Sequence, residues 1–103
     1  MANVRGFEKL AISSTSVPLA SIPQGAQSFY GYLESNDVRA RSDDTDPTAA
    51  TGQLIKADSE ILIGGEELAR IEFIRVSADA TLQGHYYAEP VEVIAALKAG
   101  NTL

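Results

Sequence analysis

The sequence predicts an all-β domain, mainly antiparallel, built as a small β-sandwich or barrel with a short C-terminal helix or arm. Apolar segments are short and alternate with polar residues. Gly, Pro, Asn, Asp or Ser interrupts them about every ten residues, which is the spacing of turns in sandwiches and barrels. Of the 103 residues, 45% are hydrophobic, so we expect one domain over 1–103, with its core at 8–87 and an arm at 88–103.

The first elements follow from alternation and one turn motif. Leu10 and Ile12 alternate with polar or small neighbours, which predicts a strand over 8–13 followed by a loop. Pro23 and Gly25 stand in the order of a type II turn, in which Pro sets the first central φ and Gly accepts a nearby positive φ.

The aromatic segment 28–34 is predicted to be a strand with two different faces. Tyr30 and Tyr32 share one face, whereas Gly31 lies on the other and allows another backbone to approach closely. Further strands are expected at 38–41, 53–56, 60–63, 71–76 and 80–87. The segment 71–76 carries bulk on both faces and should be a central strand. A polar loop is expected at 42–52 and one helical turn at 66–68.

The arm after Tyr87 changes in character. Pro90 suits a helix start and Gly100 a helix stop, and Val91, Ile94 and Leu97 would then form one stripe. An isolated helix of about nine residues is marginal in water, so the arm must dock on its own domain or on a neighbouring subunit. A strand through Val91 and Val93 is the alternative.

Charge and composition exclude several classes of partner. The formal net charge of −6 disfavours nucleic acid and anionic membranes. The chain has no cysteine, so disulfides and thiolate metal sites are excluded. The N-terminal residues lack the apolar stretch of a signal peptide, and we expect the protein to stay in the cytoplasm unless it leaves within a larger assembly.

The residues that could carry chemistry have simpler explanations. His85 is the one histidine, and its place in a predicted strand beside tyrosines favours a strand-surface residue over a catalytic base. Asp43, Asp44 and Asp46 could surround a hard cation, but their spacing does not match a calcium loop, and a solvated turn is the commoner case. We expect no catalytic residue, no metal site and no cofactor.

Contacts between subunits are the expected use of the surface. Tyrosines suit either a sheet face or an interface. Arg39 and Arg41 project from one face, where pairing within the chain is favoured over pairing across subunits. Both termini lie outside the predicted sheet. The interface candidates are Phe7, Tyr30, Tyr32, Arg39, Arg41, Tyr87, Val91, Ile94 and Leu97.

One stretch resembles a family of small tailed-bacteriophage proteins that are encoded among virion structural genes. The resemblance covers residues 28–87 and rests on the run Val38–Leu54, with its Arg-rich strand and Asp-Pro-Thr loop, followed by Phe73-Ile74-Arg75, Ala80-Thr81-Leu82 and Tyr86-Tyr87. The chain departs from the family pattern at Ala40, where an aromatic residue is expected, and in the sixteen residues that follow Tyr87.

The resemblance implies a bacteriophage virion structural protein with a β-sandwich or barrel fold. We expect a capsid decoration, or cement, protein that forms a homo-oligomer, a dimer or trimer, and binds the major capsid protein or other virion proteins on the outer surface of the head. Its location would be the virion, after viral assembly in the host cytoplasm. A tail or baseplate component is the first alternative. A carbohydrate-binding module that uses the tyrosines and the Asp-rich loop is the second, and an enzyme is not expected.

Overall fold

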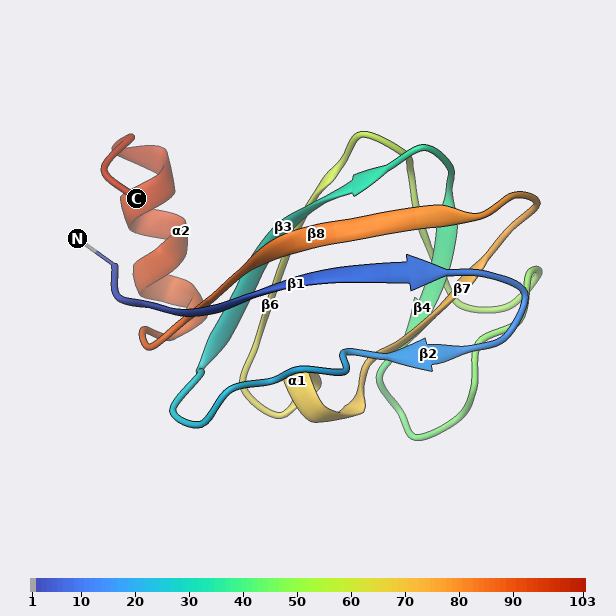
Figure 1. Ribbon diagram of the computed structural model, residues 1–103, viewed down its shortest axis with the longest axis horizontal. Coiled ribbons are helices and arrows are strands. Elements are labelled where there is room, and N and C mark those ends of the chain that lie inside the picture. The colour runs from blue at the N-terminus through green and yellow to red at the C-terminus, as the bar shows by residue number, and fades with distance from the viewer. Residues whose placement is uncertain (1) are drawn as a thin grey trace.

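The computed structural model describes residues 2–103 and places them in two antiparallel four-stranded sheets and two short helices (Figure 1). The first sheet has the order β1 (Val4–Ile12), β8 (Ala80–Tyr87), β3 (Ser28–Glu34), β6 (Glu60–Gly64). The second has the order β2 (Val17–Pro18), β7 (Glu72–Arg75), β4 (Val38–Arg41), β5 (Gln53–Ile55). The helices are α1 (Glu67–Arg70) and α2 (Val91–Ala99). The all-β fold class is confirmed, as two sheets and not as a closed barrel.

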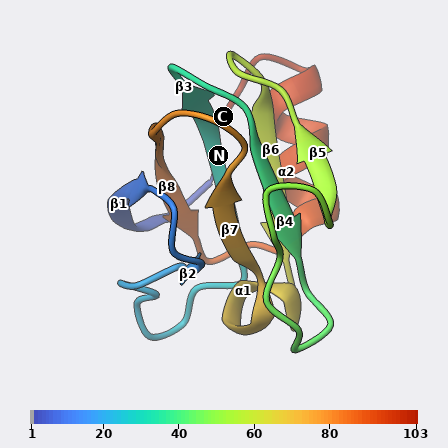
Figure 2. The same ribbon diagram turned by 90° about the vertical axis from the view of Figure 1, so that its right-hand side faces the viewer.

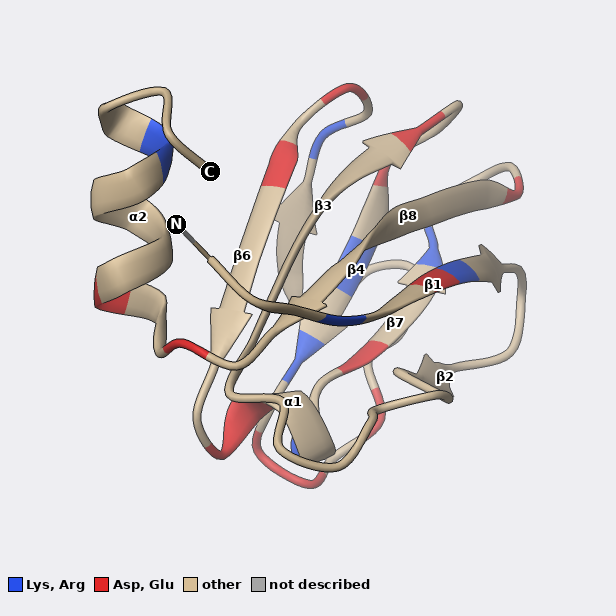
Figure 3. Ribbon diagram, turned by 60° about the vertical axis from the view of Figure 1, so that its left-hand side comes forward, with Lys and Arg blue, Asp and Glu red and all other residues tan. Residues whose placement is uncertain are grey.

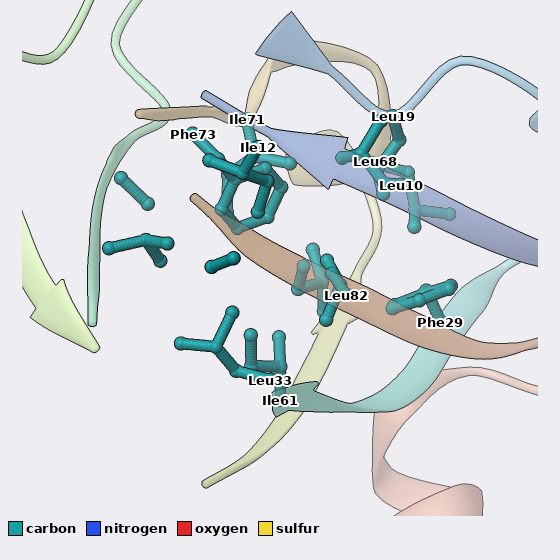
Figure 4. Packing of buried hydrophobic residues seen from close by; sticks show 14 of the residues in the cluster. Leu10, Ile12, Leu19, Phe29, Leu33, Ile61, Leu68, Ile71, Phe73 and Leu82 are labelled. Carbon is teal, nitrogen blue, oxygen red and sulfur yellow. The ribbon is translucent and has the colours of Figure 1, made fainter. Parts of the chain in front are cut away.

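The core lies between the two sheets (Figure 4). Phe29, Leu33 and Leu82 point into it from the first sheet and Val38 and Phe73 from the second, and all five are completely buried. Full burial stabilises a side chain of this size by about 1.5–3 kcal/mol. The two faces predicted for 28–34 are confirmed, and the structure shows that the apolar face meets the second sheet while the tyrosine face turns outward.

The strands predicted at 28–34, 38–41 and 80–87 have the observed bounds, and those predicted at 53–56, 60–63 and 71–76 differ from β5, β6 and β7 by no more than one residue at an end. The central position of β7 is confirmed. Two other segments differ by more. β1 begins at Val4 instead of residue 8, because β8 is long enough to pair with it as far as Tyr87. Val17 and Pro18 form a short strand against β7 within the expected loop.

The turn before β3 also differs in one respect. The Ala26 N–H donates to the Pro23 carbonyl at 3.2 Å, so Pro23 is the first residue of the turn and not its first central residue. Gly25 has φ +82°, the left-handed conformation that a type II turn requires at its second central position.

The C-terminal arm is a helix and docks on its own domain. α2 contacts β6 and β3, and its own residue Ile94 is completely buried. It lies on the side of the first sheet that faces away from the second, so helix, first sheet and second sheet form successive layers (Figures 1 and 3). From the opposite end, β7, β4 and β5 are in front and α2 lies behind β6 (Figure 2).

Within residues 2–103, the structure contains no helix with the length and apolar character needed to cross a bilayer.

Candidate interaction surface on the first sheet

The outward face of the first sheet carries one row of large side chains that crosses all four strands. Phe7 of β1 is the register partner of His85 of β8. His85 also pairs with Tyr30 of β3, and Tyr30 with Leu62 of β6. Because residues in register stand side by side on one face, these four side chains form a continuous outer row. Tyr32 lies beside it, one pleat further along β3.

The aromatic surface is the group of outward-facing rings on this sheet: Phe7, Tyr32 and His85, which are exposed, and Tyr30, which is half-buried. Phe7 retains 53% of its accessible area and Tyr32 retains 47%. The Phe7 and His85 rings are 5.1 Å apart at 65°, and those of Tyr30 and Tyr32 are 6.3 Å apart at 56°. The rings therefore stand at steep angles to one another and do not form a flat platform.

Helix α2 limits the aromatic surface on the β6 side. Lys98 of α2 places Nζ 5.7 Å from the centre of the Tyr30 ring and forms an ion pair with Glu60 of β6. The Tyr32 hydroxyl donates to Glu60 Oε1 at 3.0 Å. The hydrogen bond from Lys98 lowers the pKa of Glu60, and the bond from Tyr32 lowers it further. Desolvation raises the pKa of Tyr30, with smaller contributions from Tyr32 and Glu60, so its hydroxyl stays protonated at neutral pH.

The predicted arginines lie on the second sheet and are bound within the chain. Arg39 donates from Nε to the Ala49 carbonyl at 3.1 Å and from Nη1 to the Gly52 carbonyl at 2.9 Å, which ties the long polar loop to β4. Arg41 makes a two-pronged contact with Asp43, with Nε 3.0 Å from Oδ1. Their hydrogen-bonding groups are thus engaged in the monomer.

The remaining interface candidates are the last residue of β8 and three residues of α2. Tyr87 and Ile94 are buried, and Val91 and Leu97 are half-buried. Val91, Ile94 and Leu97 lie on the side of α2 that packs on the domain, and none of the four residues belongs to the aromatic surface. His85, which the sequence indicates only as a strand-surface residue, completes the surface through its register with Phe7 and Tyr30.

The Asp-rich loop is built around arginines. Asp43 binds Arg41, which lowers the pKa of the Asp43 carboxyl, and Asp44 binds Arg70 of α1 at 2.9 Å. Among residues 2–103, no three or more acidic or histidine side chains are grouped so that they could hold a metal ion.

A groove of about 560 Å³ lies between the edge strands β5 and β6. Its apolar walls include Ile55, Ile61 and Ile63. Charged side chains on its rim are paired within the chain, as Arg41 is with Asp43. A small-molecule site needs polar groups that converge on a ligand, whereas the charged groups here are engaged with one another.

The alternation pattern does not distinguish Glu8 from the other charged residues of the chain. In the structure, however, Glu8 is a buried carboxylate. Glu8 is 5% exposed and lies on the same inward face of β1 as Leu10. Its oxygens accept from the Ala20 N–H at 2.8 Å, the Ser21 N–H at 3.1 Å and the Tyr86 hydroxyl. These bonds tie the loop after β2 to the core, and burial together with Glu8 raises the pKa of Tyr86.

Comparison of the chain with protein-family models, with curated proteins and with solved structures finds no match.

Proposed function

We propose that this chain is a structural protein of a tailed-bacteriophage virion, and specifically a decoration protein on the outer surface of the head. The resemblance of residues 28–87 to small virion proteins motivates the proposal. That stretch contains every strand from β3 to β8 and contributes to both sheets, so the resemblance extends over the body of the fold.

The observation that best supports an assembly role is the aromatic surface. Exposed aromatic side chains gathered on one face are characteristic of protein contacts, because they bury a large area and lose little rotamer freedom. The surrounding charge fits this reading. One group of acidic residues lies away from the aromatic surface, at the end of the sandwich near α1, where Glu66 and Glu67 lie close to the Asp-rich loop (Figure 3).

Both termini belong to the folded unit, which decides how the proposal is tested. β1 begins at Val4 and α2 buries Ile94, so deletion of residues 1–7 or 88–103 would damage the domain. Point substitutions on the aromatic surface avoid this problem. If the chain is a decoration protein, the wild type should co-sediment with heads assembled from the coat protein of the same phage, and Phe7→Ala with Tyr32→Ala should weaken that association. Protein that remains wholly in the supernatant would contradict the proposal.

A carbohydrate-binding module is the second candidate, because Tyr30 and Tyr32 stand on an open sheet face. The steep angle between their rings is less suited to stacking on a sugar than a coplanar pair would be. The Asp-rich loop emerges from the second sheet, so it does not join the tyrosines in one site. Retention on an insoluble polysaccharide that is lost in Tyr32→Ala would favour this candidate over a virion role.

A further inference from the structure

We infer that the aromatic surface is the interface between two copies of this chain, which pair face to face about a two-fold axis that runs along β8. This inference extends the proposed function by naming the occupant of its assembly surface. Register, charge and the position of α2 each limit the arrangement separately.

Local charge makes this face suitable for self-association. The chain carries a formal charge of −6, so two copies repel one another through most of their surfaces. The outer face of the first sheet is different, because Lys9 of β1 and Lys98 of α2 balance Glu34 of β3 and Glu60 of β6. Repulsion between two copies is therefore lowest where the aromatic side chains are exposed.

The helix determines where the axis lies. α2 packs on β6 and the adjoining part of β3, so a second sheet has access only to β1, β8 and the remainder of β3. The centre of that area is β8, where His85 occupies the outer row. In a two-fold pair the same patch is used on both sides. An axis along β8 therefore places β1 of each copy against β3 of the other.

This arrangement gives complementary contacts. Phe7 and Tyr30 flank His85 in the outer row, so the axis sets Phe7 of one copy opposite Tyr30 of the second copy, and the two His85 rings meet at the centre. Lys9 and Tyr32 are both register partners of Gln83 and flank it on either side. The same axis therefore places Lys9 of one copy opposite Tyr32 of the second copy. Glu34 lies one pleat further along β3, within reach of that lysine.

The pair would also cover an open sheet edge. β1 is an edge strand of the first sheet, and unpaired edges are usually shielded in some way. Facing sheets pack about 10 Å apart, and α2 rises from its sheet by a similar distance. Each helix would therefore lie level with the first sheet of the other copy, alongside its β1.

The size of the patch predicts a weak dimer. Three strands of seven to nine residues give a footprint of roughly 15 Å by 25 Å at ordinary sheet spacing. This footprint falls below the total of about 1,200–2,000 Å² that stable specific interfaces bury, in the range of weak and transient contacts, even with the flank of α2 included. We therefore expect dissociation in the micromolar range, as for interfaces of this class.

The test is native mass by size-exclusion chromatography with light scattering, over roughly 1 to 300 µM, a range that brackets micromolar affinity. We expect a monomer–dimer equilibrium that Phe7→Ala and Tyr32→Ala each shift toward monomer. Leu54→Ala is the matched control, since Leu54 is 43% exposed on β5 of the second sheet, and it should leave the equilibrium unchanged. Circular dichroism confirms that each variant is folded.

A chemical cross-link tests the position of the two-fold axis in a variant that keeps Phe7, Tyr30 and Tyr32. The protein has no cysteine, so His85→Cys introduces a unique thiol on the axis. Facing strands are too far apart for a disulfide, which needs Cα atoms within about 7 Å. A bis-maleimide of about 8 Å span suits two thiols on sheets that pack at the ordinary distance. We expect it to capture covalent dimer from His85→Cys but not from the control Leu54→Cys.

Three outcomes would overturn the inference. The first is a monomer at every concentration, and the second is a dimer that Leu54→Ala dissociates and Phe7→Ala does not. The third is a monomer that is retained on polysaccharide through Tyr32, which would assign the surface to a sugar. Because these measurements use the purified chain alone, a monomer that still co-sediments with phage heads would refute the dimer and leave the proposed function standing.

Discussion

Removal of the Glu8 carboxylate should be among the most damaging polar substitutions in this protein. Glu8 is a charged side chain on the inward face of β1, 5% exposed, and it accepts three hydrogen bonds. One donor, the Tyr86 hydroxyl, belongs to a completely buried residue. The other two are the backbone N–H groups of Ala20 and Ser21, which belong to exposed residues.

The burial of each donor determines how much each substitution should lower the free energy of unfolding. In Tyr86→Phe the carboxylate keeps its two backbone donors, so the loss is one hydrogen bond to a charged group, about 1.5–2 kcal/mol in the free energy of unfolding. In Glu8→Ala the Tyr86 hydroxyl is left buried and unpaired, which adds a desolvation penalty. Water can reach the Ala20 and Ser21 amides, which limits the total to about 3–4 kcal/mol. Glu8→Gln should fall between the two, because its amide donor would face the N–H of Ala20.

A double-mutant cycle measures the coupling between Glu8 and Tyr86 directly. Urea unfolding followed by far-ultraviolet circular dichroism would give the free energies for wild type, Glu8→Ala, Tyr86→Phe and the double variant. We expect the double variant to be more stable than the sum of the single losses predicts, with a coupling of about 1.5–2 kcal/mol. Additive losses, or a cost below about 0.5 kcal/mol for Glu8→Ala, would refute the argument that the carboxylate holds the buried hydroxyl.

The remaining predictions concern the sheet and the helix. A Cβ on Gly31 would lie 2.3 Å from the Gln83 carbonyl oxygen, so Gly31→Ala should cost at least about 2 kcal/mol in chemical denaturation. Gly100→Ala, whose Cβ would meet nothing closer than 3.6 Å, should cost less than about 0.5 kcal/mol. Ile94→Ala should cost about 2–4 kcal/mol and speed amide exchange in residues 91–99 more than elsewhere, because the helix is too short to persist undocked; uniform exchange would contradict this. The pKa of Glu60 is lowered in the folded state, chiefly by Lys98, so its stabilising contribution is complete above the unfolded value, about pH 4.3, and is lost as the pH falls through the lower folded value. Tyr30 ring shifts in NMR should report this loosening in acid, and Lys98→Met should abolish it.

Several features of the fold could be read from local pattern. Pleating sends successive side chains to opposite faces, so the order of residues in 28–34 was sufficient to predict that Tyr30 and Tyr32 share one face of β3 and Gly31 lies on the other. Pro90 and Gly100 bracket the helix because proline is accommodated where a helix begins and glycine where it ends.

The pairing of distant segments was decided only by the tertiary structure. Phe7, Tyr30 and His85 are neighbours because β8 lies between β1 and β3 in one particular register, and a shift of one residue would send these side chains to the opposite face. The burial of Glu8 likewise depends on Tyr86, a residue 78 positions away. In sequence order Glu8 is one more charged residue in an alternating strand, whereas its role depends on the hydroxyl and amide donors that the folded chain brings to it. Alternation thus determined from sequence which faces could be buried, and long-range register determined which residues meet on each face.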